Sequence, residues 1–251
     1  MKIIVNASNL TVGGGVQVAL SFIQFLPFFP QHDFLVIASN KVFNQINTTE
    51  FGKNIKVEEL NFGLKNLLKR DKSIHNIEEN FKPDIVFTVF GPSYWTPKAK
   101  HLMGFALPWL INPESRAFEL LSKKELLKKR IQNAIKKQFS IKNADFYVVE
   151  TEDVKNRINK YLGAKLQNTW VVDNTYNQYF NDILPSKLPK DTFEFITISA
   201  NYPHKNLKII KNIIPLLKAK KLNFRFTLTI PPIDFKNTFG EENENIRNLG
   251  A

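Results

Sequence analysis

Short apolar runs alternate with amphipathic stretches along the first two thirds of the chain. Each run is bounded by glycine, proline or polar residues, and the stretches between them carry apolar residues at helical spacing. Such alternation is typical of a parallel sheet covered by helices on both faces. We therefore expect an α/β fold with a Rossmann-like, doubly wound sheet. The predicted strands are residues 2–5, 34–38, 55–60, 84–89, 101–106, 144–149 and 169–172.

The same alternation starts again near the C-terminus. Residues 184–191 hold two prolines and several charges, which favours a linker. A strand over 193–199, a helix over 206–219 and a strand over 224–230 are predicted beyond it. We expect residues 1–190 to form one Rossmann-like domain and residues 191–251 to begin a second, incomplete one. Two strands and one helix would give that second unit only a marginal core.

A glycine run separates the first predicted strand from the first helix, which Pro27 closes. Gly13, Gly14 and Gly15 leave room above the backbone, so the free N–H groups of the helix start could face a phosphate. The alternative is a simple flexible turn. Val16 to Val18 follow the run, where the Walker and dinucleotide motifs require other residues. An ATP or NAD site of those kinds is not expected.

The composition of the chain limits the kinds of site and partner that we expect. The chain has no cysteine and four scattered histidines, so we expect no metal site and no cofactor. It has no apolar run of membrane-spanning length, and we expect a cytoplasmic protein, with peripheral attachment to the inner face of the membrane left open. The formal charge of +12 favours phosphorylated ligands, nucleic acid or anionic lipid as partners.

Much of this charge lies in one predicted helix, residues Arg116 to Ser140. Its apolar residues include Leu120, Leu127 and Ile131, with lysines largely elsewhere. The simpler interpretation is a solvated basic face above a buried apolar stripe; the alternative is attachment to an anionic membrane surface. No recognised nucleic-acid-binding motif accompanies the charge, so specific nucleic-acid binding is not expected.

Three stretches, in this order, resemble the family 4 retaining glycosyltransferases. The first is the glycine run. The second runs from Ala144 through Thr151-Glu152 and Lys155 to Val171-Val172-Asp173-Asn174, and the third is Ser199-Ala-Asn-Tyr-Pro-His-Lys-Asn-Leu207. The resemblance implies a GT-B fold, in which two Rossmann-like domains face each other with a nucleotide sugar between them. The first domain would then take the acceptor and the second the donor.

The resemblance also implies residue roles. It places Gly13, Gly14 and Gly15 near the donor phosphates, and Lys205 with Asn206 at a helix start that faces the donor diphosphate. Departures are visible: Ala200 stands where the family has an arginine, and Thr151, Thr175 and Asn177 replace the family's usual residues. The acidic Glu-x7-Glu motif and the acceptor-side histidine have no match, so no catalytic residue is assigned.

The expected function is transfer of a sugar from a nucleotide-diphosphate sugar to a polysaccharide or lipid-linked acceptor. A nucleotide-sugar epimerase of the same shape, or a noncatalytic lipid- or polyanion-binding remnant, remains an alternative. Whether the chain is an enzyme by itself stays open, and we expect the 251 residues alone to be inactive because the donor domain is truncated. A homo-oligomer, in which a second copy covers the second unit, also stays open.

Overall fold

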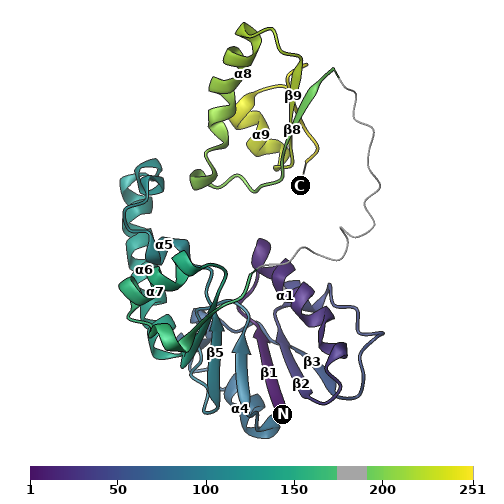
Figure 1. Cartoon of the computed structure of the whole chain (residues 1–251), viewed down its shortest axis with the longest axis vertical. Coiled ribbons are helices and arrows are strands. Elements are labelled where there is room, and N and C mark those ends of the chain that lie inside the picture. The colour runs from purple at the N-terminus through teal and green to yellow at the C-terminus, as the bar shows by residue number, and fades with distance from the viewer. Residues whose placement is uncertain (174–190, 251) are drawn as a thin grey trace. The chain divides into compact units, whose positions relative to one another are not determined.

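The computed structural model describes residues 1–173 and 191–250, and these residues form two compact units. The first comprises residues 1–115 and 127–173; the second comprises 116–126 and 191–250. Each unit is shown in Figure 1. Asn174, Thr175 and Asn177 of the family-like passage, and most of the predicted linker after Leu184, lie outside the described residues.

The first unit is built on a parallel sheet of seven strands in the order β3-β2-β1-β4-β5-β6-β7. This order reverses direction at β1, as in doubly wound folds, and it confirms the expected fold class. Each expected strand is present, with ends within a few residues of the prediction. The strands are β1 (Lys2–Ala7), β2 (Asp33–Ala38), β3 (Ile55–Glu59), β4 (Ile85–Thr88), β5 (Lys100–Gly104), β6 (Phe146–Val149) and β7 (Thr169–Val171).

Successive residues of a strand point to opposite faces of the sheet, and in these strands the residues of both faces are apolar. Helices therefore cover the sheet on both sides. In β1, Val5 packs into the core under α1, whereas Ile4 packs into the core under α4. Farther along the sheet, Met103 and Tyr147 form a third core with α7. The helices are α1 (Gly14–Gln24), α2 (Asn40–Phe43), α3 (Leu64–Leu68), α4 (Ser73–Phe81), α5 (Pro108–Ile111) and α7 (Glu152–Leu162), with 3-10 turns at Leu26–Phe28 and Leu166–Asn168. The 3-10 turn Arg116–Leu120 belongs to the second unit, and α6 (Lys123–Lys142) starts in that unit and enters the first at Leu127.

The predicted helix over Arg116 to Ser140 was wrong in two respects. The chain forms a separate 3-10 turn at Arg116–Leu120, and α6 then starts at Lys123. Ser122 explains the break, because its Oγ accepts from the Glu125 N–H at 3.3 Å while Glu125 Oε2 accepts from the Ser122 N–H at 2.9 Å. This reciprocal pair is a capping box. The expected buried stripe is also absent from α6, where only Ser140 is buried.

The second unit contains more structure than expected. Its parallel sheet has the order β10-β9-β8, which repeats the arrangement of β3-β2-β1. Helix α9 and strand β10 were not predicted, and they add Phe235 and Ile246 to the core. The elements are β8 (Phe193–Thr197), α8 (Ile210–Ala219), β9 (Phe224–Leu228), α9 (Pro232–Phe239) and β10 (Ile246–Asn248), with 3-10 turns at Pro203–Lys205 and Leu207–Ile209.

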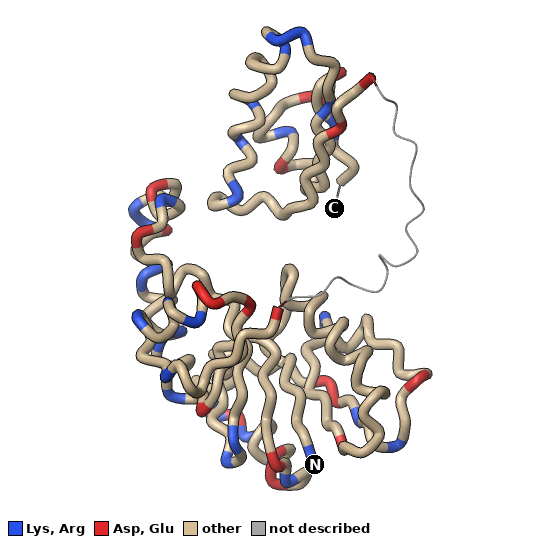
Figure 2. Tube along the Cα trace, in the orientation of Figure 1, with Lys and Arg blue, Asp and Glu red and all other residues tan. Residues whose placement is uncertain are grey.

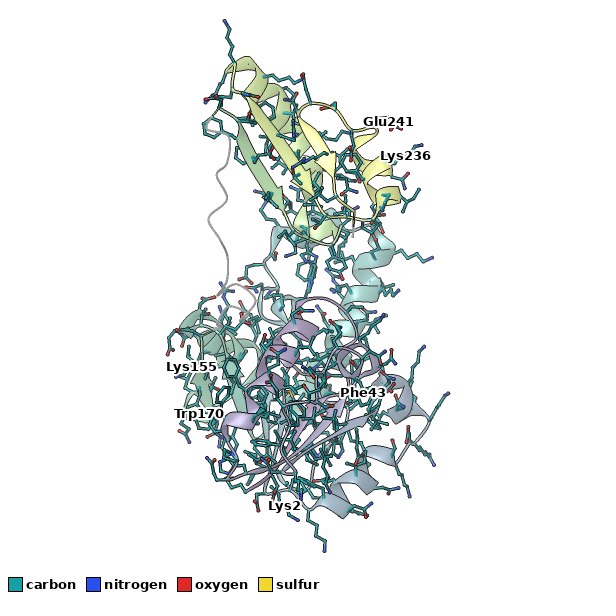
Figure 3. The ribbon with its side chains drawn as sticks, turned by 90° about the vertical axis from the view of Figure 1, so that its right-hand side faces the viewer. Lys2, Phe43, Lys155, Trp170, Lys236 and Glu241 are labelled. Carbon is teal, nitrogen blue, oxygen red and sulfur yellow. The ribbon has the colours of Figure 1, made fainter. Side chains whose placement is uncertain are left out.

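Side chains fill the space between sheet and helices in each unit (Figure 3). Figure 3 also labels Trp170 on the edge strand β7, where the ring lies 5.4 Å from that of Phe146. Within residues 1–173 and 191–250, no helix has both the length and the hydropathy that a membrane span requires.

Candidate functional site

The candidate site of the first unit lies where the strand order reverses, between β1 and β4. The two strands pair in parallel, with Val5 beside Phe87 and Asn6 beside Thr88. The loop after β1 continues into α1 and the loop after β4 starts at Val89, so both loops leave the carboxyl edge of the sheet side by side. In doubly wound sheets the crevice at this position is where ligands bind.

The glycine run forms the turn into α1. Gly13 has φ +73°, a conformation that side chains rarely adopt, and it is the N-cap of the helix. Within the described residues, no side chain caps this end, and the first turn contains no acidic residue. No atom would meet a Cβ placed on Gly13 or Gly14 within 4 Å. The helix start therefore offers N–H groups and open space to an anion.

Asn9 joins the two loops. Its Nδ2 donates to the carbonyl oxygen of Phe90 at 2.8 Å and to that of Pro92 at 3.2 Å. A Cβ on Gly15 would lie 3.4 Å from Leu10 and 3.5 Å from Phe90, so the third glycine faces the β4 loop rather than open space. The glycine run is thus open at its first two positions and packed at its third.

Two further glycines let the β4 loop approach β5. The Gly91 N–H donates to the carbonyl oxygen of Gly104 at 2.8 Å. A Cβ on Gly104 would overlap the carbonyl oxygen of Val89, and a Cβ on Gly91 would overlap the side chain of Met103. These glycines are required by packing, and no role was predicted for them from the sequence.

A buried chain of polar groups runs beneath the site. The amide oxygen of Asn6 accepts from the Ser8 hydroxyl at 2.7 Å, and Asn6 Nδ2 donates to Thr88 Oγ1 at 3.1 Å. Thr88 Oγ1 lies 2.8 Å from His101 Nε2, and His101 Nδ1 is hydrogen-bonded to the carbonyl oxygen of Asn143. All five residues are buried.

Burial lowers the pKa of His101 to about 4, against smaller opposing effects of the Asn143 carbonyl and Asp145. The imidazole is therefore neutral at pH 7, with Nδ1 donating to Asn143 and Nε2 accepting from the Thr88 hydroxyl. This tautomer leaves Thr88 Oγ1 as acceptor for Asn6. This series of hydrogen bonds holds the start of the glycine loop in place. In the sequence, it is marked only by polar residues inside otherwise apolar strands.

An apolar cavity of about 360 Å³ lies beside α1 in the same unit. Aromatic rings form much of its wall, and Phe22 and Phe87 contact each other with ring centroids 5.0 Å apart. Its lining includes Ser21, Phe22, Phe25, Phe87, Phe90 and Val148. A cavity with this lining suits an apolar or aromatic group better than a charged one.

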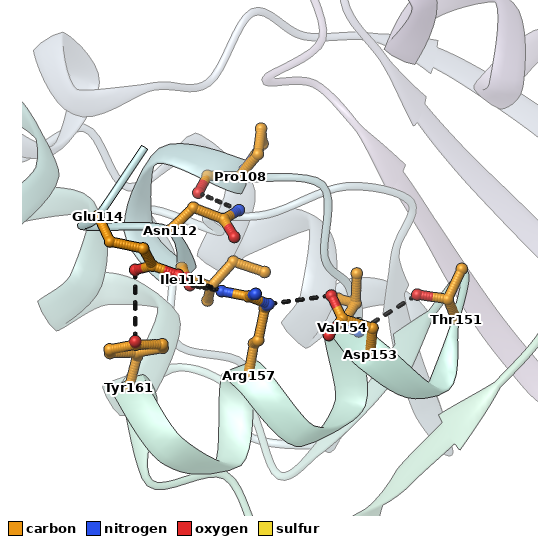
Figure 4. Close-up of polar contacts among 9 residues, drawn as sticks. All are labelled: Pro108, Ile111, Asn112, Glu114, Thr151, Asp153, Val154, Arg157 and Tyr161. Carbon is orange, nitrogen blue, oxygen red and sulfur yellow. Dashed lines mark hydrogen bonds and ion pairs between the residues drawn. The ribbon is translucent and has the colours of Figure 1, made fainter. Parts of the chain in front are cut away.

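The second family-like stretch forms the start of α7. Thr151 is the N-cap, and its hydroxyl accepts from the Val154 N–H at 3.2 Å (Figure 4). Farther along the helix, Arg157 donates to Glu114 at 2.6 Å and to Asp153 at 2.9 Å (Figure 4). The hydrogen bond from Arg157 lowers the pKa of the Glu114 carboxyl. Lys155 carries no such network and pairs with Glu152 at 3.9 Å.

The third stretch belongs to the second unit. Lys205 ends the 3-10 turn Pro203–Lys205, and Asn206 follows it in the left-handed conformation with φ 47°. The predicted helix start near Asn206 is therefore corrected: a 3-10 turn at Leu207–Ile209 comes first, and α8 starts at Ile210. Both Lys205 and Asn206 are exposed. The glycines and these two residues lie in different units.

No group of three or more histidine, cysteine, aspartate and glutamate side chains in the described residues is arranged to hold a metal ion. No family model and no curated protein matches the sequence. Solved structures do match. Anabaena HepE in complex with UDP and glucose aligns with a TM-score of 0.60 and 12% identity, over 100% of this chain and 69% of its own.

Two other similar structures come from Rickettsia. A glycosyltransferase from Rickettsia africae aligns with a TM-score of 0.58 and 18% identity, over 99% of this chain and 68% of its own. The UDP-N-acetylglucosamine 2-epimerase of Rickettsia bellii gives a TM-score of 0.56 and 14% identity over the same shares. The fold is of the GT-B type.

The GT-B fold explains why the glycine run could be located from sequence. A sheet that reverses its strand order at β1 exposes the loop after β1, and the run occupies that loop. The fold does not assign a role to Gly13, Gly14, Gly15, Lys205 or Asn206, because enzymes of one fold carry out different reactions. Those assignments remain predictions.

Proposed function

We propose that the chain is a glycosyltransferase, or part of one, that uses a nucleotide-diphosphate sugar as donor. The observation that carries this proposal is the uncapped start of α1, with open space above Gly13 and Gly14 at the reversal point of a GT-B sheet. The HepE structure, which holds UDP and glucose, supports a sugar nucleotide as the ligand class. Membership of family 4, with retention of configuration, is the finer form of the proposal.

In the proposed reaction, the bond between the anomeric carbon and the diphosphate oxygen breaks and an acceptor hydroxyl oxygen replaces it. The negative charge that develops on the diphosphate requires fixed positive groups. The N–H groups at the start of α1 are proposed for this role in the first unit, and Lys205 is proposed for it in the second. The acceptor is proposed to be a glycan or a lipid-linked sugar, in a polysaccharide pathway of the cytoplasm.

Donor binding is tested by calorimetry with UDP, GDP and ADP. Gly14→Val should weaken binding of the nucleoside diphosphate at least about tenfold, because its side chain fills the space above the helix start. Gly63→Val is the matched control, since Gly63 also has no atom within 4 Å of a Cβ and lies outside the site. Equal affinity of the parent and Gly14→Val for the nucleoside diphosphate would show that the glycines form a turn and do not bind the ligand.

The epimerase alternative rests on the matched epimerase structure and is separated by product analysis. A transferase releases a nucleoside diphosphate and extends the acceptor, whereas an epimerase converts one nucleotide sugar into an isomer of equal mass. Release of a nucleoside diphosphate from a UDP-, GDP- or ADP-sugar would support the transferase, and an isomeric nucleotide sugar formed without that release would support the epimerase.

A further inference from the structure

Helix α6 carries a row of exposed, mostly apolar residues on the side that faces away from the protein. Leu127, Ile131, Ala134, Gln138 and Ile141 recur at spacings of four and three residues, so they lie in one row along the helix. The side chains of Leu127 and Ile131 are 62% and 55% exposed, and Ala134 and Ile141 are exposed as well. We name this row the outer stripe.

The opposite side of α6 is attached to the first unit through polar and aromatic groups. Asn133 Nδ2 donates to the carbonyl oxygen of Trp109 at 3.1 Å, and Lys129 Nζ lies 4.5 Å from the centre of the Trp109 ring. Ser140 is buried, and its carbonyl oxygen accepts from the Tyr147 hydroxyl at 2.7 Å. These contacts fix the rotation of the helix, so the outer stripe cannot turn inward without breaking them.

Basic residues flank the outer stripe on both sides. At 100° per residue, Lys123, Arg130 and Lys137 fall along one side of it, and Lys124, Lys128 and Lys142 fall along the other. Figure 2 shows lysine and arginine distributed along α6. The helix has eight basic residues and one acidic residue, Glu125, which is engaged by Ser122 at 2.6 Å. A positive field therefore surrounds the apolar row.

We propose that this face of α6 docks on the surface of a bilayer that contains anionic phospholipid. The outer stripe would enter the boundary between headgroups and acyl chains, while the long lysine and arginine side chains reach up to the phosphates. Each basic residue near such a surface adds attraction to anionic lipid. The proposal does not rest on the proposed function, since a chain without transferase activity would dock in the same way.

The alternatives fit the stripe less well. Nucleic acid would use the lysines but would leave Leu127 and Ile131 in water. A second copy of α6 would need a longer seam, because coiled coils are sustained over three or four heptads, whereas this row has two and includes Ala134 and Gln138. A bilayer surface with anionic headgroups can contact the apolar side chains of the outer stripe and the basic residues on both sides of it at the same time.

Vesicle flotation tests the proposal with the full chain. Vesicles of phosphatidylcholine alone are compared with an equal mixture of phosphatidylcholine and phosphatidylglycerol. We expect binding only to the mixture, and a decrease at high salt. The double variant Leu127→Gln/Ile131→Gln should bind about tenfold more weakly, because the charge stays while the apolar contact is lost. Lys124→Gln should weaken binding roughly fivefold.

The matched control is Leu68→Gln/Leu216→Gln, which removes two leucines that are at least as exposed from other helices and should bind as the parent does. Circular dichroism is used to check that all variants are folded. Equal binding to both vesicle types, or no loss in the Leu127→Gln/Ile131→Gln variant, would overturn the proposal. So would binding to nucleic acid without binding to vesicles, or a dimer in sedimentation that the same double variant dissociates.

Discussion

At the scale of single residues, the buried imidazole of His101 connects β5 to the hydrogen bonds beneath the candidate site. It lies between the Thr88 hydroxyl and the Asn143 carbonyl and cannot gain a proton without losing its acceptor role toward Thr88. Thr88 Oγ1 would then accept from both His101 and Asn6, and the Thr88 hydroxyl hydrogen would lose its acceptor next to the pair of Asn6 and Ser8. A titration in the core is thereby connected to the loop that leads into α1.

The stability of the first unit should therefore fall as the pH is lowered. An unfolded histidine has a pKa near 6.5, whereas that of folded His101 is about 4, so the unfolded state binds the proton first. This contribution is complete above pH 6.5 and is lost progressively as the pH falls toward 4. We expect a loss of about 2 kcal/mol between pH 7 and pH 5.

Urea denaturation at the two pH values measures this loss. His101→Asn serves as the comparison, because it removes the titrating group and should flatten this part of the pH dependence, although its stability at pH 7 is lower. If the parent and His101→Asn lose equal stability between pH 7 and pH 5, the imidazole is not the group responsible.

Gly104→Ala should be strongly destabilising. The added methyl group would overlap the Val89 carbonyl oxygen, and that oxygen belongs to the backbone of the neighbouring strand end. Overpacking of this kind costs at least about 2 kcal/mol in the free energy of unfolding. Gly63→Ala, which meets no atom within 4 Å, should change stability by less than about 1 kcal/mol in the same urea titration.

At the scale of elements, the strands were predictable because each is a short apolar run with a clear boundary. The helix ends were harder. The region from Leu64 to Phe81 has apolar residues at helical spacing on both sides of a polar stretch, 69–73, and it forms two helices, with Arg70 between them in a left-handed conformation with φ 55°. Helix α9 was not predicted, although Pro232 stands at its first position, where a proline favours a helix start.

The candidate site shows the same division between local and distant information. The glycine turn is local in sequence and was found. The chain from Ser8 to Asn143 joins residues of different strands, and Asn9 reaches the β4 loop. Such contacts depend on which strands are neighbours, and apolar periodicity does not reveal strand order. Leu127 and Ile131 were predicted to share one helix face, but that face was expected to be buried, and its true direction depends on contacts to Trp109.

The cap of α7 gives a test at this scale. Thr151→Ala should destabilise the first unit by about 1 kcal/mol, since the Val154 N–H loses its acceptor. Thr151→Ser keeps the hydroxyl and should differ from the parent by less than about 0.5 kcal/mol. Thermal unfolding of the two variants measures the difference. If serine is as costly as alanine, the capping contact is not the reason for threonine at this position.

At the scale of the whole molecule, two units with separate cores should differ in stability. The first has three core clusters around seven strands, whereas the second has one cluster around three. Strand β8 lies at the end of the second sheet, and Phe193, Ile196 and Ile198 near it are exposed. Small units bury a low fraction of their surface, so the second should open more readily.

Hydrogen exchange tests this difference. Amides of β8 should exchange faster than those of β1 and β4 in dilute protein, and their protection should rise with protein concentration if a second copy covers the strand. Equal protection of β8 and β1 at every concentration would show that the second unit has cover and stability of its own.

The close approach between the β4 loop and β5 restricts how this sequence can diverge. Every single-nucleotide change away from a glycine codon that still encodes an amino acid introduces a Cβ, and at Gly104 any Cβ overlaps the Val89 carbonyl. Gly91 has more tolerance in principle, since the side chain of Met103 opposes it and could change with it. Among natural variants we therefore expect position 104 to be fixed and positions 91 and 103 to covary, a pattern that sequencing of close relatives would reveal without any structure.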